Sequence, residues 1–249
     1  MAAPVFFIDP GIDPGPDGLI HVTGEEARHA AQVVRLRPGE RVDLVDGAGR
    51  RLEGTVSEAS RDRLDVHVTH VVHEAEPTPR VIVIQALAKG DRGEQAVAAM
   101  TEVGVDVIVP WSAAHCVTRW TGERALRGVD KWRTTARASA KQARRSRVPD
   151  VLPLHSTGDL DAVIQGAALV LCLDESAPQP LAAMEIPDLG DIVLVVGPEG
   201  GLSEAEREQL GQAGARLARL GPSVLRTSTA GPVGAAVVLS RTPRWGAPT

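Results

Sequence analysis

The chain has 249 residues, of which 43% are hydrophobic and 2% aromatic, and its formal net charge is −5. This composition excludes a disordered or collagen-like protein, and the length allows one large domain or two smaller ones. The two cysteines, Cys116 and Cys172, are too few for a disulfide-stapled secreted scaffold. The longest uncharged stretch is shorter than the roughly 20 residues that a bilayer span needs. We therefore expect a soluble, cytoplasmic protein, and the acidic total by itself argues against a nucleic-acid partner.

The first 73 residues are expected to form a small β-rich domain, a compact barrel. Residues 41–45 and 63–71 alternate polar and apolar side chains, as half-buried strands do. One helix is predicted before them, from Glu25 to about Arg35. Residues 74–80 contain two prolines and are interpreted as a linker, with an ordinary loop between strands as the alternative.

The pattern of the sequence changes after Arg80. Continuous apolar runs replace the alternation, which is typical of strands buried on both faces of a parallel sheet. Helical patterns separate these runs, so the remainder of the chain is expected to be an α/β domain with a mainly parallel sheet. The predicted strands cover residues 81–84, 106–109, 168–173 and 192–196, and the predicted helices cover residues 93–103, 123–146 and 203–213.

The basic residues are concentrated in one segment. Residues 119–147 contain ten Lys or Arg and two acidic residues, whereas both ends of the chain are acidic. Arginine dominates this segment, and its guanidinium group matches phosphate oxygens bidentately. We predict a phosphate-binding ridge along one helix face, with a merely solvated face as the alternative. The ridge consists of Arg133, Arg137, Lys141 and Arg144, extended past the helix end by Arg145 and Arg147.

Three motifs that suggest other chemistry lack support. His67, His70 and His73 would not converge on a metal ion, because alternation along a strand sends His70 to the opposite face. His115 beside Cys116 is an adjacency in sequence rather than catalytic geometry, and both cysteines are interpreted as small core residues. The sequence contains neither a P-loop nor a dinucleotide fingerprint. We expect no metal ion and no kinase, ATPase or nicotinamide chemistry.

Two loops near the C-terminus follow predicted buried strands. Residues 197–202 read Gly-Pro-Glu-Gly-Gly-Leu, and residues 220–230 place Arg226 and three hydroxyl side chains before an uncharged helix predicted from about Pro232. Open α/β sheets bind ligands at the carboxyl ends of their strands, and glycines let a ligand touch the backbone itself. Each loop alone is accounted for by a tight turn, but the two together predict a ligand pocket.

These two motifs at this spacing resemble a known family. Gly-Pro-Glu-Gly-Gly-Leu at 197–202 and Leu-Gly-Pro-Ser-Val-Leu-Arg-Thr at 220–227 are similar to the SPOUT class of RNA methyltransferases. Within that class the chain resembles the small-subunit rRNA uridine N3-methyltransferase family of the RsmE type. The likeness extends to residues 29–35, 101–105 and 142–149.

The resemblance implies an α/β protein with a PUA-like β-barrel over residues 1–73 and a trefoil-knotted SPOUT domain over residues 81–249. It implies S-adenosyl-L-methionine as cofactor, small-subunit ribosomal RNA as substrate and a homodimer, with no metal or membrane partner. It also adds His29 and Arg35 to the expected RNA-binding residues. The cofactor-binding residues that it implies are Leu173, Gly197, Glu199, Gly200, Gly201, Leu220, Leu225, Arg226, Thr227 and Ser228.

The chain departs from the family pattern at Ser228, where the family commonly has glutamate. Uracil N3 must lose its proton before it attacks a methyl group, and a cation near the uracil carbonyls favours that anion. Arg226 is the first candidate for this catalytic role and Arg145 is the second. The alternatives are a SPOUT methyltransferase for another nucleotide, an RNA-binding assembly factor made inactive by the missing carboxylate, and a small-molecule-binding α/β protein.

Overall fold

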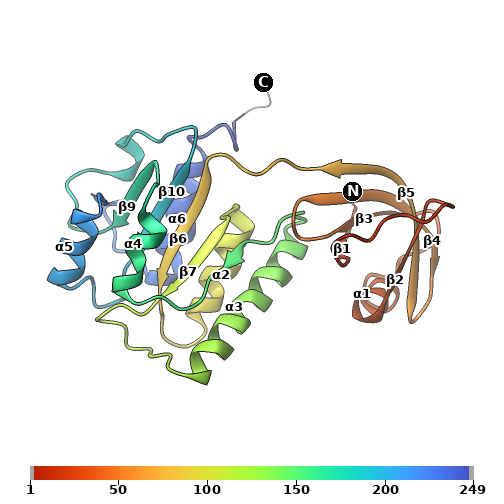
Figure 1. Ribbon diagram of the computed structural model, residues 1–249, viewed down its shortest axis with the longest axis horizontal. Coiled ribbons are helices and arrows are strands. Elements are labelled where there is room, and N and C mark those ends of the chain that lie inside the picture. The colour runs from red at the N-terminus through yellow and green to blue at the C-terminus, as the bar shows by residue number, and fades with distance from the viewer. Residues whose placement is uncertain (1–2, 247–249) are drawn as a thin grey trace. The chain divides into compact units, whose positions relative to one another are not determined.

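The computed structural model describes residues 3–246 and contains two compact units, each with its own sheet (Figure 1). One unit consists of residues 3–76 together with Ala140–Val148, and the other consists of residues 77–139 and 149–246. The first unit is therefore discontinuous in sequence. None of the described helices is both long enough and apolar enough to cross a membrane.

The first unit is a five-stranded curled sheet with strand order β1-β3-β4-β5-β2 (Figure 1). β1 pairs with β3 in parallel and the other pairs are antiparallel. The inward side chains form one apolar core, in which Phe6, Leu44 and Leu52 are fully buried. The expected β-rich unit is confirmed, as a half-barrel whose edges are β1 and β2. Its strands are β1 (Val5–Phe7), β2 (Leu19–Thr23), β3 (Arg41–Val45), β4 (Arg50–Ala59) and β5 (Arg63–His73).

The helix predicted before β3 is present, but it changes midway from an α-helix to a π-helix. It begins as α1 (Gly24–Arg28) and continues as a π-helix, η1 (His29–Val34). Arg35 then adopts a left-handed conformation with φ 59°, and the Leu36 amide donates to the Ala30 carbonyl at 3.0 Å. This closes the helix in the way that a glycine usually does.

The second unit is a six-stranded, entirely parallel sheet with strand order β11-β9-β10-β6-β7-β8. The apolar runs predicted as strands are its central members, and almost every residue of β6, β7 and β10 is buried. The predicted parallel α/β sheet is confirmed. Its strands are β6 (Arg80–Ala86), β7 (Val107–Trp111), β8 (Asp150–Val151), β9 (Leu169–Leu173), β10 (Asp191–Val196) and β11 (Arg216–Ala218).

Helices connect these strands, largely where periodicity predicted them. The Ser203 hydroxyl caps α5, and Glu206 completes a capping box. The longer helices are α2 (Arg92–Val103), α3 (Glu123–Gln142), α5 (Glu204–Gln212) and α6 (Thr227–Leu239). The short ones are η2 (Thr157–Asp159), α4 (Leu160–Ile164) and η3 (Leu181–Ala183).

The prediction that α3 continues to residue 146 is wrong. The helix ends at Gln142, and Arg144 takes the left-handed conformation with φ 55°. The Arg145 amide then donates to the Ala140 carbonyl at 2.9 Å, which is the closing bond of a Schellman motif. Arg144 therefore does not share a helix face with Arg133.

The prediction that the last helix begins near Pro232 is also wrong, because α6 begins at Thr227 and holds Pro232 inside it. Two glycines let this helix pack closely on the sheet. A Cβ atom on Gly231 would lie 2.9 Å from Gln85 Oε1, and one on Gly234 would lie 2.9 Å from Leu173 Cδ1. The close packing places the first turn of α6 beside the carboxyl ends of the central strands.

Both cysteines are core residues of the second unit and are free thiols. Burial raises the pKa of the Cys116 thiol, and it raises that of Cys172 to about 12. At pH 8 only about one Cys172 in ten thousand is then the reactive thiolate.

We expect iodoacetamide at pH 8 to leave both thiols of the folded protein unmodified for hours, and to modify both within minutes in denaturant. Mass spectrometry of the intact protein measures this, and rapid modification of the folded protein would contradict the core assignment.

Candidate functional site

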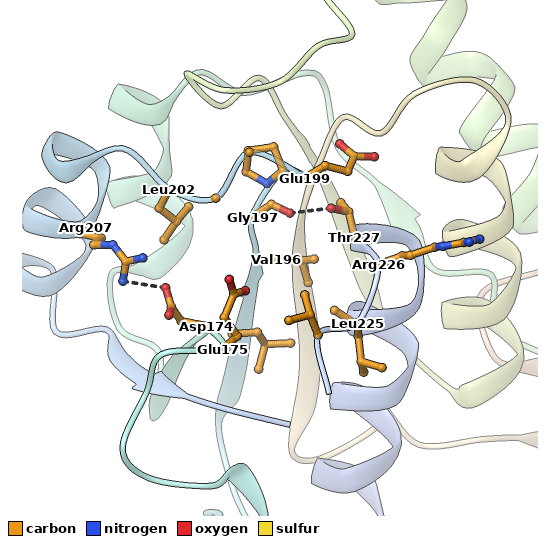
Figure 2. A pocket seen from close by; sticks show the side chains of 16 residues that line it. Asp174, Glu175, Val196, Gly197, Glu199, Leu202, Arg207, Leu225, Arg226 and Thr227 are labelled. Carbon is orange, nitrogen blue, oxygen red and sulfur yellow. Dashed lines mark hydrogen bonds and ion pairs between the residues drawn. The ribbon is translucent and has the colours of Figure 1, made fainter. Parts of the chain in front are cut away.

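A cavity of about 440 Å³ lies in the second unit at the carboxyl ends of β9 and β10, beside the first turn of α6 (Figure 2). This is the edge of a parallel sheet at which ligands bind, and the volume is within the range of small-molecule sites. Its walls combine apolar side chains, carboxylates and exposed backbone. The lining residues are Leu173, Asp174, Glu175, Val196, Gly197, Pro198, Glu199, Gly200, Gly201, Leu202, Arg207, Val224, Leu225, Arg226, Thr227 and Ala230.

The glycine-rich loop that follows β10 is held at both ends. The Gly201 amide donates to the Pro198 carbonyl at 2.9 Å, and Gly201 has a φ of 71° that favours glycine. The Thr227 hydroxyl donates to the Gly197 carbonyl at 3.1 Å, as Figure 2 shows. This bond joins the two loops that the sequence singled out, so they form one pocket.

Two carboxylates follow β9 directly, and sequence reasoning did not identify them. Asp174 pairs with Arg207 at 2.6 Å (Figure 2), and it accepts from the Ser176 amide at 2.8 Å. Burial opposes ionisation of Asp174, but the hydrogen bonds from Ser176 and the charge of Arg207 outweigh it, so its pKa lies below the usual value. Glu175 is exposed and lies beside it at the cavity. Because both follow a buried strand, the rule that selected the other loops would have found them.

Arg226 is the residue immediately before α6. Its carbonyl accepts from the amides of Thr229 and Ala230 at 2.8 and 2.9 Å, which fixes the backbone at the cavity wall. The side chain is exposed, and Figure 2 shows its guanidinium directed away from the cavity. Within the described part of the chain, the guanidinium has neither an ion pair nor a hydrogen bond. A cation of this kind is available to a second molecule that approaches the mouth of the pocket.

The structure brings together most of the residues predicted to bind the cofactor. Leu220 lines a smaller adjoining pocket, and Ser228 lies on α6 without lining either pocket. The predicted residues that line the main cavity are Leu173, Gly197, Glu199, Gly200, Gly201, Leu225, Arg226 and Thr227. The lining residues outside the predicted cofactor-binding set are Asp174, Glu175, Val196, Pro198, Leu202, Arg207, Val224 and Ala230, of which Pro198, Leu202, Val224 and Ala230 belong to the two loops that predicted the pocket.

The residues predicted to bind RNA fall into both units. Arg133 and Arg137 lie on the part of α3 that belongs to the second unit, where both are exposed, and Arg133 pairs with Asp130 at 3.1 Å. The others belong to the first unit: His29, Arg35, Lys141, Arg144, Arg145 and Arg147. Arg35 and Arg144 are exposed, and Arg145 is half-buried.

Lys141 is engaged inside the first unit. Its ammonium group donates to Glu26 Oε2 at 2.5 Å and to His29 Nδ1 at 2.8 Å, and it lies 4.8 Å from the centre of the Phe6 ring. Only 15% of its side chain is exposed. Lys141 and His29 thus fasten the end of α3 to the half-barrel.

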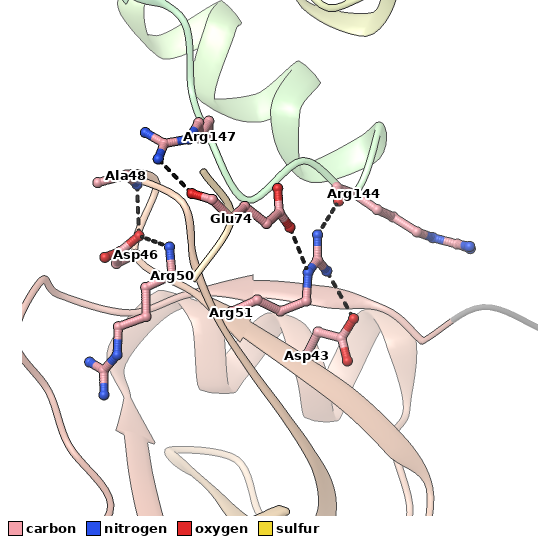
Figure 3. A network of polar contacts seen from close by, with 8 residues as sticks. All are labelled: Asp43, Asp46, Ala48, Arg50, Arg51, Glu74, Arg144 and Arg147. Atoms are coloured by element: carbon pink, nitrogen blue, oxygen red, sulfur yellow. Dashed lines mark hydrogen bonds and ion pairs between the residues drawn. The ribbon is translucent and has the colours of Figure 1, made fainter. Parts of the chain in front are cut away.

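Arg147 is also turned into the first unit (Figure 3). Its Nη2 donates to the Glu74 carbonyl at 2.8 Å, and a Cβ atom on Gly49 would lie 2.5 Å from its guanidinium carbon. The Arg144 carbonyl accepts from Arg51 Nη2 at 2.9 Å, while the Arg144 side chain points outward in Figure 3. In residues 144–147, the Arg147 guanidinium therefore packs against Gly49 and Glu74 of the first unit, whereas the Arg144 side chain is exposed.

The three histidines of β5 are exposed, and among the residues described here no group of three or more His, Cys, Asp or Glu side chains could hold a metal ion.

Comparison with known families gives two matches. The model of an RNA methyltransferase domain matches residues 74–239, and the model of an RNA methyltransferase PUA domain matches residues 22–69. The curled half-barrel is therefore PUA-like, and the parallel sheet with its pocket is a methyltransferase domain.

Individual relatives agree with these matches. The ribosomal RNA small subunit methyltransferase E of Mycobacterium bovis is 41% identical over 99% of this chain and 95% of its own length. That of Bacillus subtilis is 30% identical over 84% of this chain and 85% of its own length. The crystal structure of the Neisseria gonorrhoeae protein of that name, bound to S-adenosyl methionine, superposes with a TM-score of 0.81 at 27% identity, covering 96% of this chain and 97% of that one. With its pocket at the strand ends and both domains matched, the chain belongs to the ribosomal RNA small subunit methyltransferase E family.

Proposed function

We propose that this protein transfers a methyl group from S-adenosyl-L-methionine to N3 of a uridine in small-subunit ribosomal RNA. The observation that carries the proposal is the glycine-walled cavity at the strand ends, with an unpaired arginine beside it, in a chain of this family. We take the RNA substrate from the relatives, which are named as ribosomal RNA small subunit methyltransferases. We take the methyl donor from the relative whose structure was solved with S-adenosyl methionine bound. Such a substrate places the protein in the cytoplasm.

The residues of the cavity fit the cofactor. S-adenosyl-L-methionine has an adenine ring, a ribose with two hydroxyls, and a charged amino-acid end. Leu173, Val196 and Leu225 offer apolar wall for a ring, and Glu175 and Glu199 offer acceptors for hydroxyl or ammonium groups. At Gly197, Gly200 and Gly201 of the glycine-rich loop, no side chain of the residue itself covers the backbone donors and acceptors that face a ligand.

Methyl transfer to uracil N3 requires that the reacting atoms be held in position and that the negative charge on the uracil be stabilised. The bound cofactor supplies an electrophilic methyl group, and its in-line transfer depends on holding the attacking atom within about 3–3.5 Å. The uracil N3–H bond must break, with its proton lost to a base, so that N3 attacks as an anion. We assign Arg226 to stabilise the negative charge on the uracil carbonyls, with Arg145 as the second candidate. The target base must be turned out of its stack to be reached.

We assign RNA contact to Arg35 and Arg144 first. They are the only residues other than glycine with positive φ among those described, and both are exposed arginines that close a helix. An L-residue in this conformation is strained relative to glycine, and retained strain often accompanies function. A guanidinium at each position binds phosphate oxygens, and we assign RNA contact next to Arg145 of the first unit and to Arg133 and Arg137 of the second. Lys141 and Arg147 then act by holding the segment in place.

Arg144→Gly separates these roles. Glycine adopts the left-handed turn freely, so we expect the melting temperature to stay the same or to rise slightly. Loss of the guanidinium removes one phosphate contact, so affinity for small-subunit rRNA falls several-fold and the salt slope of log K decreases by about 1. Arg147→Ala is the matched comparison and should lower the melting temperature instead. Unchanged RNA affinity for Arg144→Gly at low salt would remove Arg144 from the contact.

We also propose a homodimer with the pocket near its interface. Val224 is 71% exposed and Val233 is 36% exposed, on the loop before α6 and on α6 itself. An interface formed by this part of the second unit would remove both side chains from water. Light scattering at micromolar concentration should give twice the chain mass.

The function is tested on small-subunit rRNA from cells that lack the protein. Purified protein and methyl-labelled cofactor should yield labelled 3-methyluridine after digestion to nucleosides. A labelled product at another nucleoside would support the alternative substrate. Cofactor and RNA binding without turnover would support the inactive assembly factor, which the serine at position 228 suggests.

A further inference from the structure

Glu206 is a buried carboxylate next to the pocket and does not line it. It lies in the first turn of α5 and is only 3% exposed. Its Oε2 accepts from the Ser203 amide at 2.9 Å and from the Ser203 hydroxyl at 2.8 Å. Its Oε1 accepts from the Ala114 amide at 2.8 Å and from the Thr157 hydroxyl at 3.2 Å.

The two carboxylate oxygens of Glu206 accept hydrogen bonds from different parts of the chain. The bonds of Oε2 complete the capping box of α5, which is an ordinary helix-end device. The bonds of Oε1 go instead to two other loops, since Ala114 follows β7 and Thr157 follows β8. A capping box does not require this second pair, so Oε1 joins segments that are distant in sequence.

The donors to Oε1 are themselves fixed. Trp111, fully buried at the end of β7, donates from Nε1 to the Thr157 hydroxyl at 3.2 Å, which orients that hydroxyl toward Glu206. Burial opposes ionisation of Glu206, but hydrogen bonds from Ala114, Ser203 and Thr157 outweigh it, so its pKa is lowered. Charge-assisted bonds of this kind are stronger than neutral ones.

The loop that holds Ala114 also contacts the wall of the cavity. His115 Nδ1 donates to the Gly201 carbonyl at 3.0 Å. A Cβ atom on Gly200 would lie 3.0 Å from the Cβ of His115, so the two backbones are in close contact. A shift of Ala114 would therefore move the backbone that supports Gly200 and Gly201.

We infer that Glu206 is a positioning residue, which clamps the loop after β7 against the glycine-rich loop and so fixes the wall of the cofactor pocket. This inference rests on the proposed function for the identity of the ligand. It concerns a residue that neither touches the cavity nor belongs to the motifs that predicted it.

The decisive variant is Glu206→Gln. In either orientation the amide places an NH2 group against a backbone N–H, that of Ser203 or that of Ala114, so one of these two bonds is lost while volume is kept. We expect the Kd and the KM for S-adenosyl-L-methionine to rise at least 10-fold, with kcat at saturating cofactor within 3-fold of wild type. Amide hydrogen exchange without ligand should accelerate in residues 112–116 and 197–202, and not in β6.

Two further variants keep the test independent of folding. Thr157→Val removes one donor to Oε1 and leaves the capping box, so we expect the Kd to rise about 3-fold with the same local acceleration of exchange. Glu204→Gln alters an exposed carboxylate in the same turn and should change neither quantity. Wild-type affinity in both Glu206→Gln and Thr157→Val, or exchange that accelerates equally in β6, would overturn the inference.

Failure of the proposed function has a different outcome. If the wild-type protein does not bind S-adenosyl-L-methionine, the proposed cofactor is wrong. The exchange measurements still decide whether Glu206 holds the two loops together.

Discussion

Replacing Arg226 by alanine is expected to lower the rate of methyl transfer by at least about 100-fold, which is the effect of removing one donor to a developing anion. The guanidinium is directed away from the cavity and has no described partner, so its loss should leave the fold and the cofactor affinity nearly unchanged. Single-turnover transfer to rRNA at saturating cofactor measures the rate. Calorimetric titration with the cofactor measures the affinity.

Two variants give this prediction its controls. Arg226→Lys keeps the charge and loses the planar fork, so an intermediate rate is expected if the guanidinium contacts two oxygens. Arg216→Ala removes another exposed arginine of the same unit and should have no effect. Near-wild-type turnover of Arg226→Ala would transfer the catalytic role to Arg145, the second candidate.

Replacing Ala230 by phenylalanine is expected to weaken S-adenosyl-L-methionine binding on the order of 100-fold, or about 2.7 kcal/mol. Ala230 lines both the main cavity and the smaller pocket beside it, so a phenyl ring there occupies ligand volume. The position is only half-buried, and the ring can turn into the cavity without displacing the core. Equilibrium dialysis with labelled cofactor checks this prediction.

The control for Ala230→Phe is Thr229→Phe, one residue earlier on α6. Thr229 is exposed and does not line the cavity, so the same ring should leave the Kd within about 2-fold of wild type. Both variants should melt within a few degrees of the wild-type protein. Equal losses in the two variants would mean that α6 is disturbed as a whole, whereas wild-type affinity in Ala230→Phe would mean that the cavity is not the cofactor site.

The central strands could be predicted from the sequence because burial on both faces leaves a local trace. The run from Ile192 to Val196 in β10 contains only apolar residues, and its prediction as a buried strand is confirmed.

The ends of helices were harder to predict from the sequence. Arg144 ends α3 by adopting the conformation of a glycine, and an arginine gives no sign of this in sequence. Pro232 suggested a helix start, but α6 begins five residues earlier because Arg226 already provides its first carbonyl acceptor.

In the candidate site too, some residues could be predicted from the sequence and others could not. The glycine-rich loop was visible because close backbone approach needs glycine, and its position after a strand followed from the sheet type. Arg207 could not be found in this way, because it reaches the cavity from a helix and its partner Asp174 is distant in sequence. Lys141 read as part of an exposed ridge, but its contacts with Glu26 and His29 depend on the tertiary structure.

The interrupted course of the first unit has a consequence for how the protein is made. The chain passes between the units three times, at residues 76–77, 139–140 and 148–149. Val5, Phe7 and Val45 pack with Ala140 and Val148. During synthesis, that face of the N-terminal half-barrel stays uncovered until residue 148 has left the ribosome. A nascent chain must therefore extend across more than half of its length before its N-terminal domain can close.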